Sequence, residues 1–135
     1  MGNVVVTVRR IGLEIIPDAF ESFVKKTLVL PTKDKNTGIR VDFIFSFTPY
    51  ERQAIERAKP VFLKGIAVKF ASAEDVVIHK IFAGRPRDVE DVRSIMLKNP
   101  DLDLEYTTKR LKEFDRSMES DGFTKLLDNL LKEMG

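Results

Sequence analysis

The sequence predicts an α+β fold, in which a mixed β-sheet of amino-terminal hairpins precedes a helical carboxyl-terminal half. Runs of β-branched and aromatic residues separated by turn residues occupy residues 1–71, whereas residues 72–135 repeat apolar residues at helical spacing. The chain has 135 residues, of which 43% are hydrophobic and 33% charged, as in a soluble globular protein. We therefore expect residues 1–135 to form a single domain with a sheet-rich part and a helical part.

The sheet-rich part is expected to alternate strands with two short helices. Residues 3–8 are mostly β-branched and predict a strand, and Pro17 with Asp18 predicts the start of a short helix. Thr48 followed by Pro49 predicts a capped helix that runs to about residue 59. Two hairpins are expected around turn residues, with strands at residues 28–33, 39–47, 61–63 and 66–70.

The helical part is punctuated by cap and stop residues. Ser72 with Asp75 resembles a capping box, and Gly84 is suited to end the first helix. Pro86 then starts a second helix, which is expected to end near residues 99–100. Two further helices are expected at about residues 103–114 and 123–133, and the last carries a stripe of leucines.

Charge and cysteine content exclude several classes of function. A net charge of +2 is too small to indicate nucleic-acid binding. The absence of cysteine excludes disulfides and thiolate metal sites, and it agrees with a cytoplasmic location. The apolar runs are too short for a membrane span and the amino terminus does not look like a signal peptide, so we expect no membrane association.

One acidic residue interrupts the most strongly predicted strand. Asp42 lies in a run with apolar residues on both faces, which is typical of a buried central strand. A buried carboxylate is costly without a partner, so one interpretation is a metal ligand that holds Mg²⁺ against a triphosphate. The alternatives are a structural aspartate whose hydrogen bonds are satisfied and an aspartate at an exposed strand end.

Two helices of the second half each turn a charge toward their apolar side. Lys80 falls within the apolar arc of the first helix and Asp88 within that of the second, which predicts a partly buried Lys80–Asp88 ion pair. Glu74 also falls between apolar residues of its helix. The alternative is that these side chains extend along the edge of the core to reach water.

Two arginines flank the proline at the start of the second helix. Arg85 and Arg87 are suited to grip phosphate at a helix amino end, where the helix dipole favours anions. The alternative is a solvated pair that neutralises Asp88 and the acidic residues after it.

Four segments occur in an order that resembles a known family. They are Gly38 to Ser46, Thr48 to Glu51, Ser72 to Asp75 with Lys80, and Ala83 to Asp88 with Asp91. The series resembles small prokaryotic nucleotidyltransferases, related to the abortive-infection and minimal nucleotidyltransferases of the polymerase-β superfamily. The resemblance spans about residues 14–115, which is most of the chain.

The resemblance implies a mixed sheet with helices against it and a magnesium-dependent reaction, the transfer of a nucleoside monophosphate from an NTP to an acceptor. Asp42 matches the family's third catalytic carboxylate, which would be a metal ligand. The resemblance makes the other polar residues candidates for triphosphate contacts (Lys80, Arg85, Arg87) or for supporting contacts (Glu74, Asp88, Asp91).

One departure from the family is serious. Members carry a Gly-Ser or Gly-Gly helix and an Asp-x-Asp strand upstream of the position of residue 1. Within this chain, Thr32 to Lys35 resembles the motif only in part, because Asn36 stands in place of the second acid. One carboxylate cannot hold two metals. We therefore expect a truncated nucleotidyltransferase fold that does not catalyse transfer alone, which leaves its status as an enzyme open.

The same departure leaves two other expectations. The alternative function is a non-catalytic binding or regulatory module that retains the scaffold, as in toxin–antitoxin systems. A third hypothesis is a helical domain that binds phosphate or nucleic acid. A fold that lacks those elements would expose a sheet edge, so we expect a homodimer or a partner protein that covers it. NTP is the small ligand that the resemblance implies.

Overall fold

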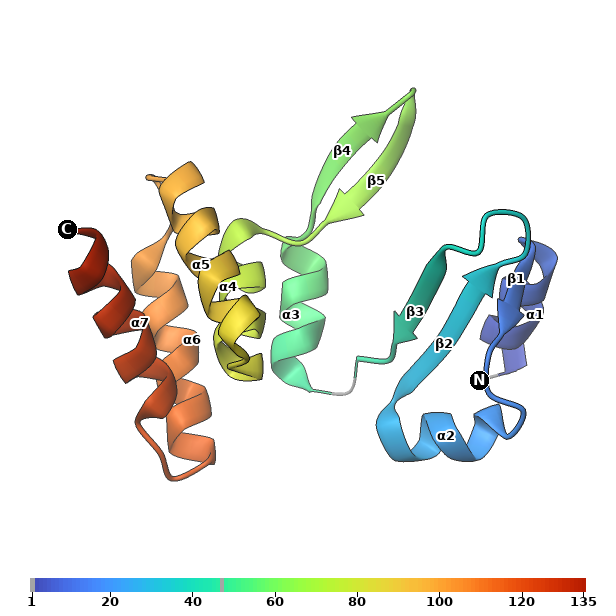
Figure 1. Cartoon of the computed structure of the whole chain (residues 1–135), viewed down its shortest axis with the longest axis horizontal. Helices are drawn as coiled ribbons and strands as arrows, with labels where there is room; N and C mark the ends of the chain where they lie inside the picture. Colours follow the sequence, from blue (N-terminus) through green and yellow to red (C-terminus); the bar gives the residue numbers. More distant parts are fainter. Residues whose placement is uncertain (1, 47) are drawn as a thin grey trace. The chain divides into compact units, whose positions relative to one another are not determined.

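The α+β class is confirmed by a computed structural model that describes residues 2–46 and 48–135 (Figure 1). The strands form two antiparallel sheets, in the orders β1-β2-β3 and β4-β5, where one mixed sheet was expected. The elements are α1 (Gly2–Arg10), β1 (Leu13–Ile15), α2 (Phe20–Thr27), β2 (Val29–Asp34), β3 (Arg40–Ile44), α3 (Pro49–Arg57), β4 (Lys59–Leu63), β5 (Ile66–Phe70), α4 (Ala73–Ala83), α5 (Pro86–Lys98), α6 (Leu104–Ser117) and α7 (Gly122–Met134).

The chain divides into two compact units, Met1–Arg52 and Gln53–Gly135. In the first unit, residues from α1, β1, α2 and β2 form the core, which consists of Val8, Leu13, Val24 and Leu30. In the second unit, the helices supply the fully buried side chains, among them Val77, Ile78, Ile81, Val92, Leu111, Leu127 and Leu130. Each unit therefore buries apolar surface of its own.

The prediction of a strand at residues 3–8 is wrong, because this segment forms α1. Val4 and Val8 lie one helical turn apart and both face the core of the first unit, whereas Val6 is 65% exposed. A strand would place Val4, Val6 and Val8 on one face. Packing of one helical face therefore outweighs the weak preference of valine for strands.

The two predicted hairpins are confirmed. β2 pairs with β3 in an antiparallel register that sets Leu30 opposite Phe43. The strand expected at residues 39–47 is observed at Arg40–Ile44, and its expected end at Phe47 lies outside the described residues. β4 and β5 are joined by Lys64 and Gly65, whose φ angles of 50° and 81° are those of a type I′ turn.

The predicted caps also form. The Thr48 hydroxyl accepts a hydrogen bond from the Glu51 N–H, and Glu51 Oε2 accepts one from the Thr48 N–H, which completes a capping box at α3. Gly84 adopts a φ of 63° at the end of α4, so the chain turns directly into α5. None of the described helices is both long enough and apolar enough to cross a membrane.

The cap of α4 generates a stability prediction. The buried Ser72 hydroxyl accepts from the Asp75 N–H at 3.2 Å and donates to Asp75 Oδ2 at 2.8 Å. Ser72→Ala should lower the free energy of unfolding by about 1–2 kcal/mol, because both bonds are lost at a buried helix start. Urea unfolding checks this value. Ser117→Ala, at an exposed hydroxyl in α6, should change little, and equal stability of the two variants would contradict the role of the cap.

Candidate functional site

Asp42 lies on an edge strand, not on the buried central strand that the sequence predicts. Among the described residues, β3 pairs with β2 alone, and the Asp42 side chain is 35% exposed. The strand alternates Val41 and Phe43, which face the core, with residues that face outward. The run looks apolar on both faces because Ile44 is apolar yet 72% exposed.

Asp42 belongs to a row of charges on the outer face of the sheet. Its carboxylate accepts two hydrogen bonds from Arg40 Nε, at 2.9 and 3.1 Å. Arg40 is directly opposite Lys33, which in turn lies opposite Glu14 and 3.5 Å from its carboxylate. Hydrogen bonding to Asp42 raises the pKa of Arg40. The row thus pairs each acid with a cation and leaves its members partly exposed.

The predicted Lys80–Asp88 ion pair is confirmed and extends to Asp91. Lys80 Nζ from α4 donates to Asp88 Oδ1 at 3.1 Å and to Asp91 Oδ2 at 2.6 Å, both on α5. Asp88 is buried, whereas the Lys80 side chain remains 31% exposed. The hydrogen bonds that Lys80 donates to Asp91 and Asp88 raise its pKa. This side chain therefore joins the two helices at the end where Gly84 connects them.

The two arginines of the α4–α5 turn behave differently. Arg85 Nε donates to Asp88 Oδ2 at 2.5 Å, so the carboxylate lies between Arg85 and Lys80. This arginine, and next Lys80, hold the pKa of Asp88 at about 2. Arg87 is exposed in the first turn of α5, and no described side chain pairs with it. The structure thus groups Lys80, Arg85, Asp88 and Asp91 and leaves Arg87 outside the network.

A second buried network was missed by sequence reasoning. Asp75 is fully buried, and its carboxylate accepts hydrogen bonds from Arg57 Nε at 3.3 Å and from the Tyr106 hydroxyl at 2.9 Å. The Arg57 guanidinium also lies 3.9 Å from the centre of the Tyr106 ring, a cation–π contact. Burial and the bond to Asp75 raise the pKa of Tyr106. The sequence indicates a cap residue on the polar side of its helix, next to His79, and gives no signal for the burial of Asp75 or for its distant partners.

Glu74 is part of the surroundings of this network. Its carboxylate accepts from the Asp103 N–H at 3.2 Å and lies 3.8 Å from Arg57. Burial would raise the pKa of Glu74, but hydrogen bonds from its own N–H, Asp103 and Ser72 lower it. Glu74 therefore connects α4 to the start of α6, which is a structural role within the second unit.

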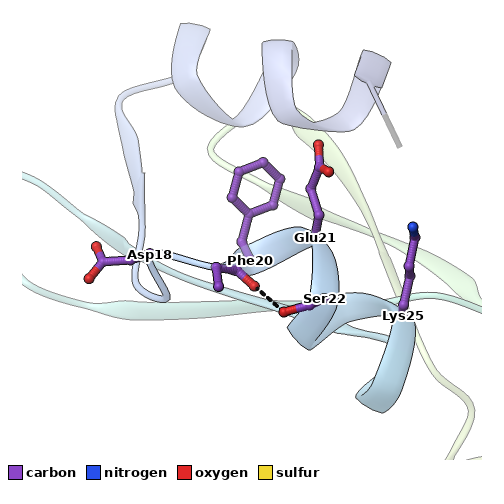
Figure 2. A pocket seen from close by; sticks show the side chains of 6 residues that line it. Asp18, Phe20, Glu21, Ser22 and Lys25 are labelled. Carbon is purple, nitrogen blue, oxygen red and sulfur yellow. Dashed lines mark hydrogen bonds between the residues drawn. The ribbon is translucent and has the colours of Figure 1, made fainter.

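A pocket at the start of α2 has little chemistry to offer. Its lining includes Asp18, Phe20, Glu21, Ser22 and Lys25 (Figure 2). Ser22 Oγ donates to the Ala19 carbonyl at 3.0 Å, and Phe20 packs against the core of the first unit. The remaining side chains are those of an exposed helix start, and none of the residues expected to act in catalysis lies here.

The described residues do not gather metal ligands. Across residues 2–46 and 48–135, no group of three or more histidine, cysteine, aspartate or glutamate side chains could hold a metal ion. Asp42 is instead bound by the guanidinium of Arg40, which would have to be displaced by a cation. The acids near Lys80 are likewise occupied by cationic side chains.

The chain is thus an α+β protein with two ionic networks in its second unit. One lies at the α4–α5 turn, and the other joins the end of α3 to the first turns of α4 and α6. A family model described as "Nucleotidyltransferase of unknown function (DUF6036)" matches residues 49–130. This range covers more than half of the chain, so the chain belongs to this nucleotidyltransferase family. The resemblance seen in the sequence is confirmed at that level.

The family match contains both networks of the second unit and does not extend to Asp42. No curated protein and no solved structure matches the chain. The match therefore bears on the helical part, where Lys80, Asp88 and Asp91 lie, and leaves the role of Asp42 a prediction.

The depressed pKa of Asp88 predicts a pH dependence of stability. The folded pKa is about 2 against 3.8 for the free side chain, so the ion pairs stabilise the fold fully above pH 3.8. Their contribution is lost as pH falls through about 2, because the protonated carboxyl no longer attracts Lys80 and Arg85. Urea unfolding between pH 2 and 6 measures the difference in the free energy of unfolding between wild type and Asp88→Asn. This difference should become smaller as the pH falls. The exposed Asp128→Asn is the control, and a difference that stays constant with pH would contradict the ion pairs.

Proposed function

We propose that this chain is a nucleotidyltransferase-like protein that does not transfer nucleotides by itself. The family reaction would move a nucleoside monophosphate from an NTP to an acceptor, with magnesium holding the triphosphate. The observation that carries the proposal is the surroundings of Asp42, where the bound partner is Arg40 and not a second carboxylate. In support, no group of three or more acidic or histidine side chains among the described residues could hold a metal ion, whereas a pair of magnesium ions needs several such ligands.

The cations near the α4–α5 turn differ in their freedom to bind phosphate. Lys80 already forms ion pairs with two carboxylates, those of Asp88 and Asp91. Arg85 also forms an ion pair with Asp88. Arg87 is exposed at the amino end of α5, where the helix dipole also favours an anion. We therefore assign any contact to the NTP phosphates to Arg87, and we assign Lys80 to positioning the two helices.

A second candidate function is a non-catalytic binding or regulatory module, as in a toxin–antitoxin type of system. The Lys80 network favours it, because Lys80 is already paired with Asp88 and Asp91 and would have to leave them to bind a phosphate. In either case the free edge of β3 would accept a strand from a second copy or from a partner protein. A partner of this kind could also supply the carboxylates that Asp42 lacks.

Transfer activity tests the first proposal directly. The chain is incubated with each of the four NTPs carrying an α-phosphate label, with Mg²⁺ or Mn²⁺ and with protein or RNA acceptors. We expect no labelled product above that of Asp42→Asn, because the described part of the chain offers no cluster of metal ligands. The exposed Asp101→Asn serves as a matched control. Labelling by wild type and Asp101→Asn that Asp42→Asn abolishes would disprove catalytic incompleteness.

Thermal unfolding with ATP separates the roles of Lys80 and Arg87. A ligand that binds only the folded state raises the melting temperature. Lys80→Met should lower the melting temperature without ATP yet retain the rise caused by ATP, since it removes ion pairs and no ligand contact. Arg87→Met should leave the melting temperature without ATP unchanged and abolish the rise caused by ATP. The exposed Lys98→Met should change neither the melting temperature nor the rise. No rise for wild type at millimolar ATP would exclude nucleotide binding by this chain.

A further inference from the structure

The β4–β5 hairpin has an apolar face that no other described element of the second unit covers. The register places Val61 opposite Val68 and Leu63 opposite Ile66, with Phe70 on the same face. These five side chains are between 37% and 68% exposed. At about 200 Å² for a fully exposed large apolar side chain, they present roughly 500 Å². A continuous patch of this size on a soluble protein is typical of an interaction site.

The hairpin is also incomplete as a sheet. Figure 1 shows it projecting from the helices of its own unit, and neither strand makes an extended contact with any other described element of that unit. A lone two-stranded sheet is at best marginally stable in water, and a third strand or a covering layer is needed. Addition of a third strand would therefore stabilise the hairpin.

The two edges of the hairpin differ in what they offer to such a strand. Residues that flank a two-residue turn form a hydrogen-bonded pair, and bonded pairs then alternate with non-bonded ones. Pro60 and Lys69 occupy a non-bonded pair, at which the backbone N–H points away from the partner strand. Proline has no N–H, so the outer edge of β4 lacks a donor there. On β5, Ala67 and Lys69 both point an N–H and a carbonyl outward.

The charge of the hairpin indicates what kind of molecule would bind to it. Residues 59–70 contain Lys59, Lys64 and Lys69 and no acidic residue. A second copy of the hairpin would bring lysines against lysines, which is unfavourable. A lipid surface would leave the open edge of β5 without hydrogen-bond partners in the hydrocarbon region. A protein strand that carries acidic side chains satisfies both the charges and the edge.

We propose that the outer edge of β5 docks an extended segment of a partner protein in which apolar and acidic side chains alternate. Its backbone would bond to Ala67 and Lys69, as when a peptide adds a strand to a sheet. Its apolar side chains would then lie beside Val68 and its neighbours, and its acidic ones beside Lys69 on the opposite face. The surface lies in the second unit and is independent of the nucleotidyltransferase proposal.

The first test uses a defined probe, a short synthetic peptide of alternating valine and glutamate with blocked ends. It is titrated into the full chain by calorimetry, and amide exchange of Ala67 and Lys69 is followed by NMR. We expect saturable binding that slows exchange at both amides, and binding at least about ten-fold weaker for the peptide with lysine in place of glutamate. No saturation at millimolar peptide, or equal binding of the two peptides, would overturn the proposal.

Two matched proline variants locate the docking edge. Ala67→Pro removes an outward N–H of β5, whereas Phe62→Pro removes the outward N–H of the residue opposite it on β4. Because neither position donates to the ladder between the strands, both variants should keep the helical circular dichroism of the wild type. Ala67→Pro should abolish peptide binding and Phe62→Pro should retain it. The opposite result would assign docking to β4 and reject the proposed edge.

A charge reversal keeps the proposal testable if proline disturbs the hairpin. Lys69→Glu should reduce the preference for the glutamate peptide by about ten-fold. Three outcomes for the wild-type chain would overturn the proposal in favour of another occupant. They are self-association that Val68→Glu abolishes, binding to phosphatidylserine vesicles that Val68→Glu abolishes, and exchange at Ala67 and Lys69 that is already slow without peptide.

Discussion

The arrangement of α4 and α5 depends on the buried carboxylate of Asp88. Burial of this charge is costly, and it is offset by Lys80 from the preceding helix and by Arg85 from the turn. The carboxylate can meet both cations because only Gly84 and Arg85 separate the end of α4 from the start of α5 at Pro86. Removal of any of these features would leave a buried charge with fewer partners. One of the segments that resemble the family, Ala83 to Asp88, therefore also holds the helix pair together.

In this chain, residues that resemble family motifs also make contacts that hold the fold together. Lys80, Asp88 and Asp91 lie within the region that matches the family model, and in the fold these three side chains form ion pairs with one another. Asp42 also has the position expected of a catalytic carboxylate, yet its bonds go to Arg40 two residues away on the same strand. Family membership and catalytic competence are separate properties, and the second depends on ligands that stand together in space.

Local features of the sequence predicted most of the fold. Cap residues and turn residues act through bonds within a few positions, so the starts of α3, α4 and α5 and the turn at Lys64 and Gly65 could be located. The failures involve distant partners. The segment at residues 3–8 is helical because Val8 joins the core of the first unit. Asp75 can be buried because Tyr106 donates to it from another helix. The exposure of Asp42 depends on which strand lies at the sheet edge, and strand order is not encoded in any single segment.

The bond between Arg57 and Asp75 spans 18 residues and closes a loop that contains the whole hairpin. The entropic cost of closing a loop grows only with the logarithm of its length, and each doubling adds about 0.6 kcal/mol. Lys64 and Gly65 lie at the far end of this loop, away from the bond that closes it. The turn is therefore a natural place to graft a fluorescent or affinity tag, because the lengthened loop would burden folding of the helical core very little.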